Sequence, residues 1–399
     1  MEGRETPRID SQGGPATGFR LGLALSGGGV RAAVFHLGVL RRLAEDDLFE
    51  SVTQISTVSG GSLVIAALVT NAGMQWPGSE QYRSDTYPSL RSMLTGADLL
   101  SPRCLGWKGL LRFNLRLLSS RAMVLADLLA ERWGVRGNLR DLPERPVWWI
   151  NATCVETGKN WRFSKREMGD WQFGRHYDPP FRLADAAAAS AAVPYAIGAL
   201  RFELPQQGWY RTDPATRQPL ERRDPPHSTV HLWDGGAYEN MGLEALFKPG
   251  KALIECDFLV CSDASGPLRA PGPGPLGSLW KGHLWSPRLF DVSSDQIRAL
   301  RSRMLMREVE SGTIRAALIR MGNSVRDIDL RAGIRRTQVD YGQYQVDQEA
   351  TLALLHPTDL QAPSPDLFDR IARHGFEVAD ATLTAYSPKY FPKTRRWPV

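Results

Sequence analysis

The stretch from residue 52 to residue 69 limits what this chain of 399 residues can fold into more than any other. The β-branched run Val52–Val58 is typical of a buried strand, and the apolar run Ser62–Val69 is typical of the first turns of a buried helix. Only Ser59 and two glycines separate them. So short a turn raises the serine hydroxyl clear of the backbone and points the helix N-terminus at it. The stretch predicts a nucleophile elbow, although a simple N-cap serine would fit it too.

A second strand-to-helix junction lies upstream of the elbow. The apolar run Leu21–Leu25 leads into Gly27, Gly28 and Gly29, and a helical pattern follows over residues 32–43. Consecutive glycines at such a junction leave backbone N–H groups pointing into a cavity, with the helix dipole behind them. The loop is therefore expected to bind a phosphate or a transient oxyanion.

An aspartate provides the candidate base. Asp234 ends the predicted strand Val230–Asp234 and precedes two glycines, which places a carboxylate at the strand end where open α/β sheets form active sites. None of the seven histidines stands in a motif that marks a catalytic base, and His231 is expected on the opposite face of the strand. The simplest hypothesis is that Asp234 itself takes the proton from Ser59. The alternative is a triad completed by a later histidine, namely His283, His356 or His374.

Three blocks of the chain resemble the signatures of the patatin-like phospholipases, namely residues 27–31, 57–61 and 234–236. Residues 189–194 also resemble the Ala-Ser…Pro turn of that family, and residues 151–153 resemble a strand-turn of its bacterial members. The correspondence covers about residues 19–265, in the order of the family. One position departs from the pattern. The family usually has glycine two residues before the serine, whereas this chain has Thr57, which would tighten the turn or narrow the acyl pocket.

The resemblance implies a three-layer α/β/α fold with a mostly parallel central sheet, and a lipid acyl hydrolase of the phospholipase A or lysophospholipase type. It implies a dyad of Ser59 and Asp234 that needs no metal and no cofactor. The oxyanion hole is expected to use N–H groups of residues 27–29 and of Gly60. Arg31 is expected to strengthen the positive potential of that loop, to contact a lipid phosphate, or to form a structural salt bridge.

Other functions fit the residues less well. A general carboxylesterase or thioesterase, or a catalytically silent lipid-binding scaffold, would share the same fold. The spacing of Gly27, Gly29 and Ala32 also satisfies a loose dinucleotide-binding fingerprint. That interpretation requires an acid at the end of the next strand, where this chain has the serine elbow instead. Asp263, at the end of the apolar run 258–262, is a further candidate carboxylate, more typical of a turn or cap.

The composition indicates a domain layout. Residues 1–18 are polar and rich in glycine and proline, which predicts a disordered leader and not a signal peptide. Residues 19–290 are expected to form the catalytic domain, and residues 291–399 a helical extension packed on the core. Four cysteines without CxxC spacing, and no apolar stretch of 18 residues, indicate a cytoplasmic protein.

Basic and aromatic residues gather in three segments without acids, at 99–126, 264–290 and 386–399, in a chain of net charge +6. Lys108, Arg112 and Arg116 are spaced by four and would form one stripe on a helix. Such segments favour peripheral binding to an anionic lipid surface, although the stripe would also suit the solvated face of a core helix. Nucleic-acid binding is not expected because no recognition motif accompanies the charge. The sequence leaves the oligomeric state open.

Overall fold

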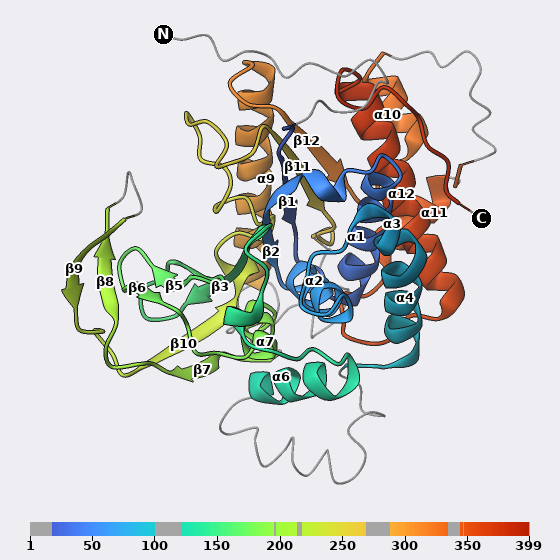
Figure 1. Ribbon diagram of the computed structural model, residues 1–399. Coiled ribbons are helices and arrows are strands. Elements are labelled where there is room, and N and C mark those ends of the chain that lie inside the picture. Colours follow the sequence, from blue (N-terminus) through green and yellow to red (C-terminus); the bar gives the residue numbers. More distant parts are fainter. Residues whose placement is uncertain are drawn as a thin grey trace.

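The computed structural model describes residues 18–99, 121–194, 197–213, 218–268, 288–333, 344–345 and 347–398. Within them, a 12-stranded sheet forms the middle layer (Figure 1). Its centre is parallel and follows the order β12-β11-β1-β2-β3. These strands are β1 (Leu21–Leu25), β2 (Val52–Val58), β3 (Val147–Cys154), β11 (Phe258–Asp263) and β12 (Ala316–Arg320).

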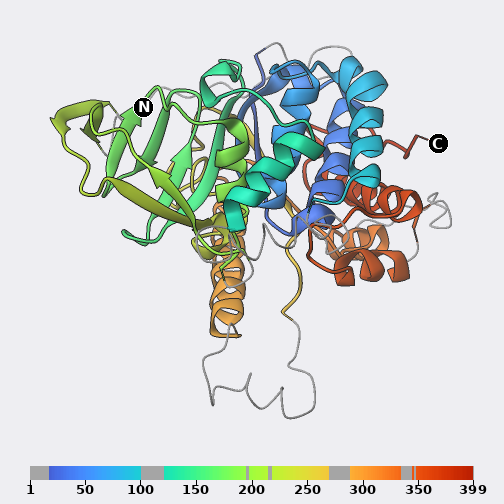
Figure 2. The ribbon, with the colours of Figure 1, turned by 90° about the horizontal axis from the view of Figure 1, so that it is seen from below.

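Beyond β3 the sheet continues with antiparallel strands, which extend to one side of the parallel part (Figure 2). They are β4 (Asn160–Phe163), β5 (Glu167–Asp170), β6 (Gly174–Tyr177), β7 (Leu200–Glu203), β8 (Trp209–Thr212), β9 (Pro219–Arg223) and β10 (Thr229–Asp234). Strand β10 pairs with β3 and β7, off the main path of the sheet. This arrangement matters because β10 carries the candidate base.

Helices cover both faces of the sheet. The described helices of more than one turn are α1 (Gly29–Ala44), α2 (Gly60–Asn71), α4 (Tyr87–Gly96), α6 (Arg121–Arg132), α7 (Leu183–Ser190), α9 (Arg288–Glu310), α10 (Val325–Arg331), α11 (Asp347–Leu355) and α12 (Pro365–Tyr386). Short turns add α3 (Ser79–Gln81), η1 (Phe49–Ser51), η2 (Tyr82–Thr86), η4 (Leu139–Asp141) and η5 (Gly235–Ala237). Leu23 of β1 packs in the core shared with α1, whereas its neighbour Ala24 shares a core with Leu305 of α9. The predicted three-layer fold is thus confirmed.

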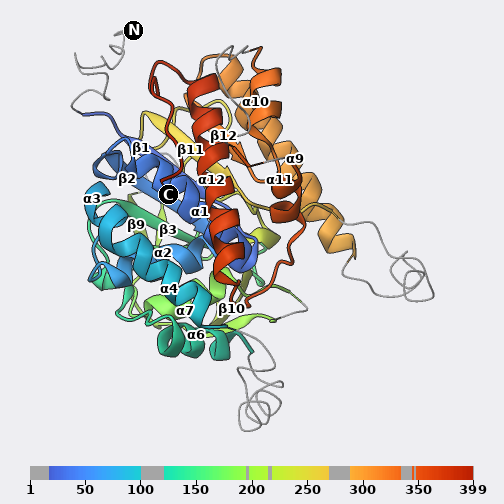
Figure 3. The same ribbon diagram turned by 90° about the vertical axis from the view of Figure 1, so that its right-hand side faces the viewer.

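The C-terminal region is part of this core. Helix α12 lies along α1 (Figure 3), and Ser364 caps its first turn by accepting a hydrogen bond from the Leu367 N–H. The buried Arg42 of α1 donates to Asp380 of α12 at 2.6 Å. The extension was expected to be helical, and it also adds β12 to the edge of the sheet. The predicted leader, up to residue 17, lies outside the described residues.

The strand order brings the candidate residues to one edge of the sheet. Leu25, near the end of β1, pairs with Thr57, near the end of β2, so the loops that follow are neighbours. Asp234 reaches the same place from the opposite direction, because β10 runs antiparallel to β3 and Asp234 pairs with Ala152. The expectation for Asp234 came from open α/β sheets, in which the carboxyl ends of parallel strands share one edge. Strand β10 runs antiparallel to β3, and its last residue still lies beside the end of β2.

Candidate active site

The glycine loop between β1 and α1 presents two backbone N–H groups. Gly28 has a φ of +141° and Gly29 a φ of +66°, both conformations that side chains disfavour. Within the described part of the chain, neither N–H group has a hydrogen-bond acceptor. The Gly27 N–H, in contrast, donates to the carbonyl oxygen of Asn240 at 3.0 Å. The loop therefore offers Gly28 and Gly29, at the N-terminus of α1, as donors to an anion.

Ser59 forms the turn between β2 and α2. Its φ of +50° and ψ of −119° are strained for a residue with a side chain, as the predicted elbow requires. The residue is buried, and its N–H donates to the hydroxyl oxygen of Ser190 at 3.0 Å. A Cβ on Gly60 would overlap the carbonyl oxygen of Gly29. The elbow and the glycine loop are therefore in direct contact.

Asp234 completes the group. Its buried carboxylate accepts a hydrogen bond from the Gly236 N–H at 2.6 Å. Burial raises the pKa of Asp234 from 3.8 to about 6, and the Gly236 N–H and the nearby Ser59 side chain limit the rise. A carboxylate with this pKa is ionised at neutral pH and is a better proton acceptor than an ordinary aspartate.

Neighbouring elements hold both side chains in place. The Asp234 N–H donates to the carbonyl oxygen of Ala192, and the Thr153 hydroxyl donates to the carbonyl oxygen of Asp234, each at 2.9 Å. The Ser190 hydroxyl, which supports Ser59, donates to the carbonyl oxygen of Asn151 at 2.6 Å. The blocks around residues 151 and 190, noted in the sequence for their resemblance to the family, contribute these contacts to Ser59 and Asp234.

The family model for patatin-like phospholipases matches residues 23–247 of the chain, which include the glycine loop, Ser59 and Asp234. The chain belongs to the patatin-like phospholipase family. Membership supports lipid acyl hydrolysis as its general activity. No curated protein matched this patatin-like chain.

Solved structures with a similar fold include human GIVD cytosolic phospholipase A2, with a TM-score of 0.53 and 15% sequence identity. That match covers 92% of this chain and 60% of the other. The same human protein in complex with methyl gamma-linolenyl fluorophosphonate and terbium chloride gives a TM-score of 0.52 and 16% identity, and covers 94% and 60% of the two chains. The patatin-like chain thus spans about three fifths of these proteins, and the likeness shows a common fold.

Arg31, which the sequence offered as a support for the glycine loop, lies in the first turn of α1. Its side chain is buried, and its guanidinium donates to the carbonyl oxygens of Leu354 and His356 at 2.7 and 2.8 Å, and of Ala264 at 3.2 Å. These contacts tie α1 to the C-terminal region. The carbonyl oxygen of Asp359, in the same region, accepts the Val30 N–H at 2.9 Å. The C-terminal region therefore supports the glycine loop from behind.

Three of the described histidines have side-chain partners away from Ser59 and Asp234. His36 is buried between the Ser262 hydroxyl and the Ser26 carbonyl oxygen, at 2.8 and 2.9 Å. His374 is buried and accepts the Gly322 N–H, and His231 pairs with Glu156 at 2.7 Å. His283 lies outside the described residues. Asp263 is buried, accepts the Ser265 N–H at 3.1 Å and lies 3.8 Å from Arg298, so it caps a turn.

Asn240 is a site residue that the sequence did not single out. Besides its carbonyl bond to Gly27, its side-chain nitrogen donates to the Ser265 hydroxyl oxygen at 2.8 Å. Asn240 thereby joins the glycine loop to the segment after β11. No local sequence motif marks Asn240. Its only sequence feature is that it stands six residues after Asp234.

The segments considered for membrane contact are only partly described. The stripe of residues 108, 112 and 116, and residues 269–287 of the second segment, lie outside the described residues. In the tail, Tyr390 stacks on Phe19 at 5.8 Å and Phe391 is buried against Phe258. These two rings pack on the protein, whereas Tyr386 of the same tail is exposed. Among the described helices, none has the length and apolar character needed to cross a membrane.

Protein metal sites are built from several Cys, His, Asp or Glu side chains that converge on one point. In the parts of the chain that the structure describes, no three His, Cys, Asp or Glu side chains are grouped to hold an ion.

Proposed function

We propose that this protein is a lipid acyl hydrolase of the phospholipase A or lysophospholipase type, with Ser59 as nucleophile and Asp234 as base. One observation supports the proposal: the Ser59 side chain lies near a buried carboxylate of raised pKa, beside a loop whose Gly28 and Gly29 N–H groups have no acceptor among the described residues. Family membership supports the substrate class. The alternatives are a carboxylesterase or thioesterase of broader range and a silent lipid-binding scaffold.

In the first half of the reaction, the Ser59 oxygen attacks the ester carbonyl carbon while its proton passes to Asp234. The N–H groups of Gly28 and Gly29, together with that of Gly60, donate to the oxygen that becomes negative. Gly27 contributes the shape of the loop, because its own N–H is bound to Asn240. The tetrahedral intermediate then collapses, and the alcohol leaves with the proton from Asp234.

In the second half, a water molecule attacks the acyl-serine. Asp234 accepts one proton of the water and returns it to Ser59 as the fatty acid leaves. The same N–H groups stabilise the second oxyanion. The two halves sum to the hydrolysis of one ester bond, and the site returns to its starting state.

We further propose that the enzyme is cytoplasmic and acts at membrane surfaces through the acid-free segments at 99–126 and 264–290. The direct test of the whole proposal is release of fatty acid from mixed phospholipid vesicles by purified protein, with Ser59→Ala as the control. We expect fatty acid from the wild type only, with less at high salt because surface charge is screened over about 10 Å. Activity confined to soluble esters would favour the esterase, and no release by the wild type above the Ser59→Ala background on either substrate would favour the scaffold. Equal release well above background by both proteins would exclude Ser59 as the nucleophile.

The raised pKa of Asp234 predicts the pH dependence. The base must be ionised to accept the serine proton, so kcat/KM should rise with pH, reach half its maximum near pH 6 and then level off. Below that pH, activity should fall by about tenfold per unit. The measurement is a pH series on a soluble short-chain ester. Asp263→Asn is the matched control, because Asp263 is buried at a neighbouring strand end, and should leave the midpoint unmoved. A midpoint near pH 4 in the wild type would contradict the assignment.

A further inference from the structure

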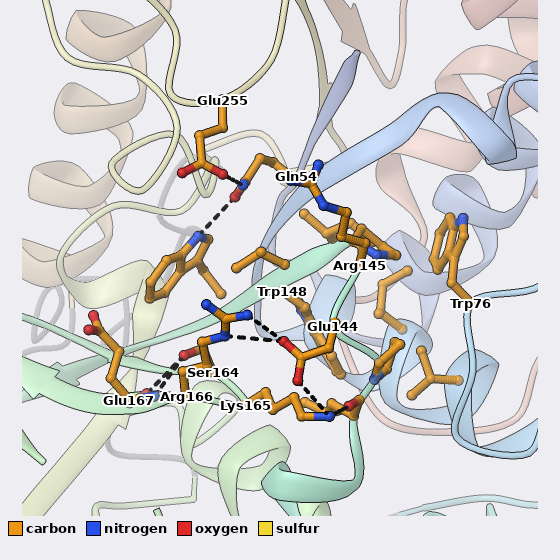
Figure 4. A pocket seen from close by; sticks show the side chains of 18 of the residues that line it. Gln54, Trp76, Glu144, Arg145, Trp148, Ser164, Lys165, Arg166, Glu167 and Glu255 are labelled. Atoms are coloured by element: carbon orange, nitrogen blue, oxygen red, sulfur yellow. Dashed lines mark hydrogen bonds and ion pairs between the residues drawn. The ribbon is translucent and has the colours of Figure 1, made fainter. Parts of the chain in front are cut away.

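A cavity of about 340 Å³ lies away from the dyad (Figure 4). Its lining includes Gln54 and Ile55, near the start of β2, and Trp148 and Trp149, near the start of β3. Ser59 follows the other end of β2, five residues after Gln54, which is about 16 Å along a strand. The cavity therefore lies at the opposite end of the sheet from the nucleophile, and its volume is within the range of small-molecule sites.

The walls of the cavity are mostly apolar. Aromatic and aliphatic side chains from β2, β3, α2 and the adjoining loops contribute to it, including Ile55, Ile65, Val69, Trp76, Leu142, Val147, Trp148, Trp149 and Ile254. Such a surface releases water when an apolar chain or ring covers it. The interior therefore suits the hydrocarbon part of a ligand.

Charged side chains form the rim. Lys165 and Arg166 both contact Glu144, at 3.2 and 2.6 Å, and Figure 4 shows them converging on it. Glu255 accepts a hydrogen bond from Gln54 at 2.9 Å, and Glu167 lies 3.5 Å from Arg175.

Arg145 is the exception on this rim. It is exposed, and among the described residues it has no acidic partner. Every described acid of the rim already has a polar or cationic partner. Glu255 contacts only the neutral amide of Gln54, so its charge is not balanced by that bond. With Arg175 counted beside the lining residues, four cations stand against three acids, and this net positive charge favours an anionic head group.

A hydrogen-bond chain links the cavity to the elbow. The Trp148 Nε1–H donates to the Thr57 hydroxyl oxygen at 2.9 Å. The hydroxyl oxygens of Thr57 and Ser62 are 2.8 Å apart, as are those of Ser62 and Ser190. Ser190 accepts the Ser59 N–H at 3.0 Å. All three hydroxyls are buried.

The direction of this chain follows from proton counting. Each hydroxyl has one proton to donate. Ser190 donates its proton to the Asn151 carbonyl oxygen, so Ser62 must donate to Ser190, and Thr57 must then donate to Ser62. Each donor therefore lies on the Trp148 side of its acceptor, up to Ser190, the residue that accepts the Ser59 N–H. Bonds aligned in this way polarise one another, so a change at the first affects the last.

Thr57 makes this link possible. It stands where patatin-like phospholipases usually have glycine, and a glycine would leave Trp148 without its acceptor and Ser62 without a donor. The departure from the family pattern therefore has a structural consequence. It connects a cavity at one end of β2 to the nucleophile at the other.

We propose that this cavity is an effector site for a single-chain carboxylate amphiphile, whose occupancy is transmitted to Ser59 through Trp148, Thr57, Ser62 and Ser190. The carboxylate pairs with Arg145, and the hydrocarbon chain packs on the tryptophan rings. A ligand against Trp148 holds its indole where the N–H reaches Thr57, which stabilises the elbow and raises kcat. Activation by a fatty acid rests on the proposed function, because a fatty acid is the product of that reaction.

The binding arm uses calorimetry with decanoate and the Ser59→Ala variant, which removes turnover from the measurement. We expect saturable binding, and at least a tenfold weaker affinity after Arg145→Glu. Arg136→Glu is the matched control, because Arg136 is exposed and does not line the cavity, and its affinity should be unchanged. Equal binding of decyltrimethylammonium, or unchanged affinity in Arg145→Glu, would overturn the assignment. This arm needs no activity, so it is independent of the proposed function.

The coupling arm measures kcat on p-nitrophenyl butyrate with and without saturating decanoate. We expect a rise of about fivefold in the wild type, at the low end of typical couplings between sites. Thr57→Val keeps the shape of the side chain and removes the hydroxyl, so decanoate should still bind without raising kcat. Trp148→Phe should behave in the same way. Trp149→Phe should keep the response, because Trp149 lines the cavity but donates to Gln54 instead.

Two results would overturn the coupling. One is a full response in Thr57→Val, which would show that the hydroxyl chain carries nothing. The other is a rise in KM without a rise in kcat, which would place decanoate in the substrate site as a competing product. Absence of all ester hydrolysis, with binding intact, would instead count against the proposed function and leave the binding site standing.

Discussion

Replacing Ser59 with alanine is expected to lower kcat by a factor of about 10⁴ or more, and replacing Asp234 with asparagine should have an effect of similar size. The two side chains share one proton transfer, so the double variant should be no worse than the poorer single variant. The measurement is single-turnover kinetics on a soluble ester, with circular dichroism to show that the fold is intact. A multiplied loss in the double variant would mean that the residues act independently. Near wild-type turnover in either single variant would exclude the dyad.

The Asp234→Asn substitution should also make the folded protein more stable. The pKa of Asp234 is about 6 in the folded protein against an ordinary value of 3.8, so the folded state holds this proton more tightly than the unfolded state. Stability is therefore lost as the pH rises from about 4 to about 6, and the loss amounts to about 3 kcal/mol at neutral pH. Asp234→Asn removes that cost. Thermal unfolding should show a higher Tm for the variant at pH 7 and little difference at pH 4, and an equal gain at both would contradict the linkage.

Gly28→Ala is expected to lower kcat by about 100-fold with little change in KM, the effect of losing one oxyanion donor. Alanine cannot adopt the φ of +141° without strain, and its Cβ would lie 2.9 Å from the Ala264 carbonyl oxygen, so the N–H must turn away. The loss falls on kcat because the charge that the loop binds exists only in the transition state.

Gly73→Ala provides the matched control for Gly28→Ala. Gly73 also has a positive φ, of +71°, but has open space around it and lies beyond the end of α2. Its substitution should cost about 1 kcal/mol of stability and leave kcat unchanged. Steady-state kinetics on both variants, each with a thermal melt, separates backbone strain from loss of a donor. A purely KM effect at Gly28 would show that the loop binds the substrate head group.

Local sequence was sufficient for the parts of the site that lie on one strand and its turn. A β-branched run followed by serine and two glycines leaves the chain few conformations, so the elbow at Ser59 was predictable. The glycine loop was predictable for the same reason, although the bond from the Gly27 N–H to Asn240 was not. That bond joins residues more than 200 positions apart, and neither carries a local signal for it.

Arg31 shows why the rest needed the structure. An arginine close after three glycines suggested a positive charge that would attract a lipid phosphate. In the structure, three carbonyl oxygens from distant segments accept hydrogen bonds from its guanidinium. The tail is a similar case, since its aromatic residues suggested a membrane surface and two of them, Tyr390 and Phe391, pack on Phe19 and Phe258. Composition reports which groups a segment carries. Only packing decides whether they face water, lipid or the core.

The sequence by itself determined the elbow, the glycine loop, the aspartate and the order of the three blocks, because each depends on neighbouring residues and their backbone preferences. The tertiary structure alone decided that β10 runs antiparallel to β3 and still delivers Asp234 to Ser59, and that the C-terminal region supports the glycine loop. It also decided that Thr57 joins Trp148 to the elbow. These features depend on contacts between residues far apart in the chain, whose geometry is settled only when the whole core packs.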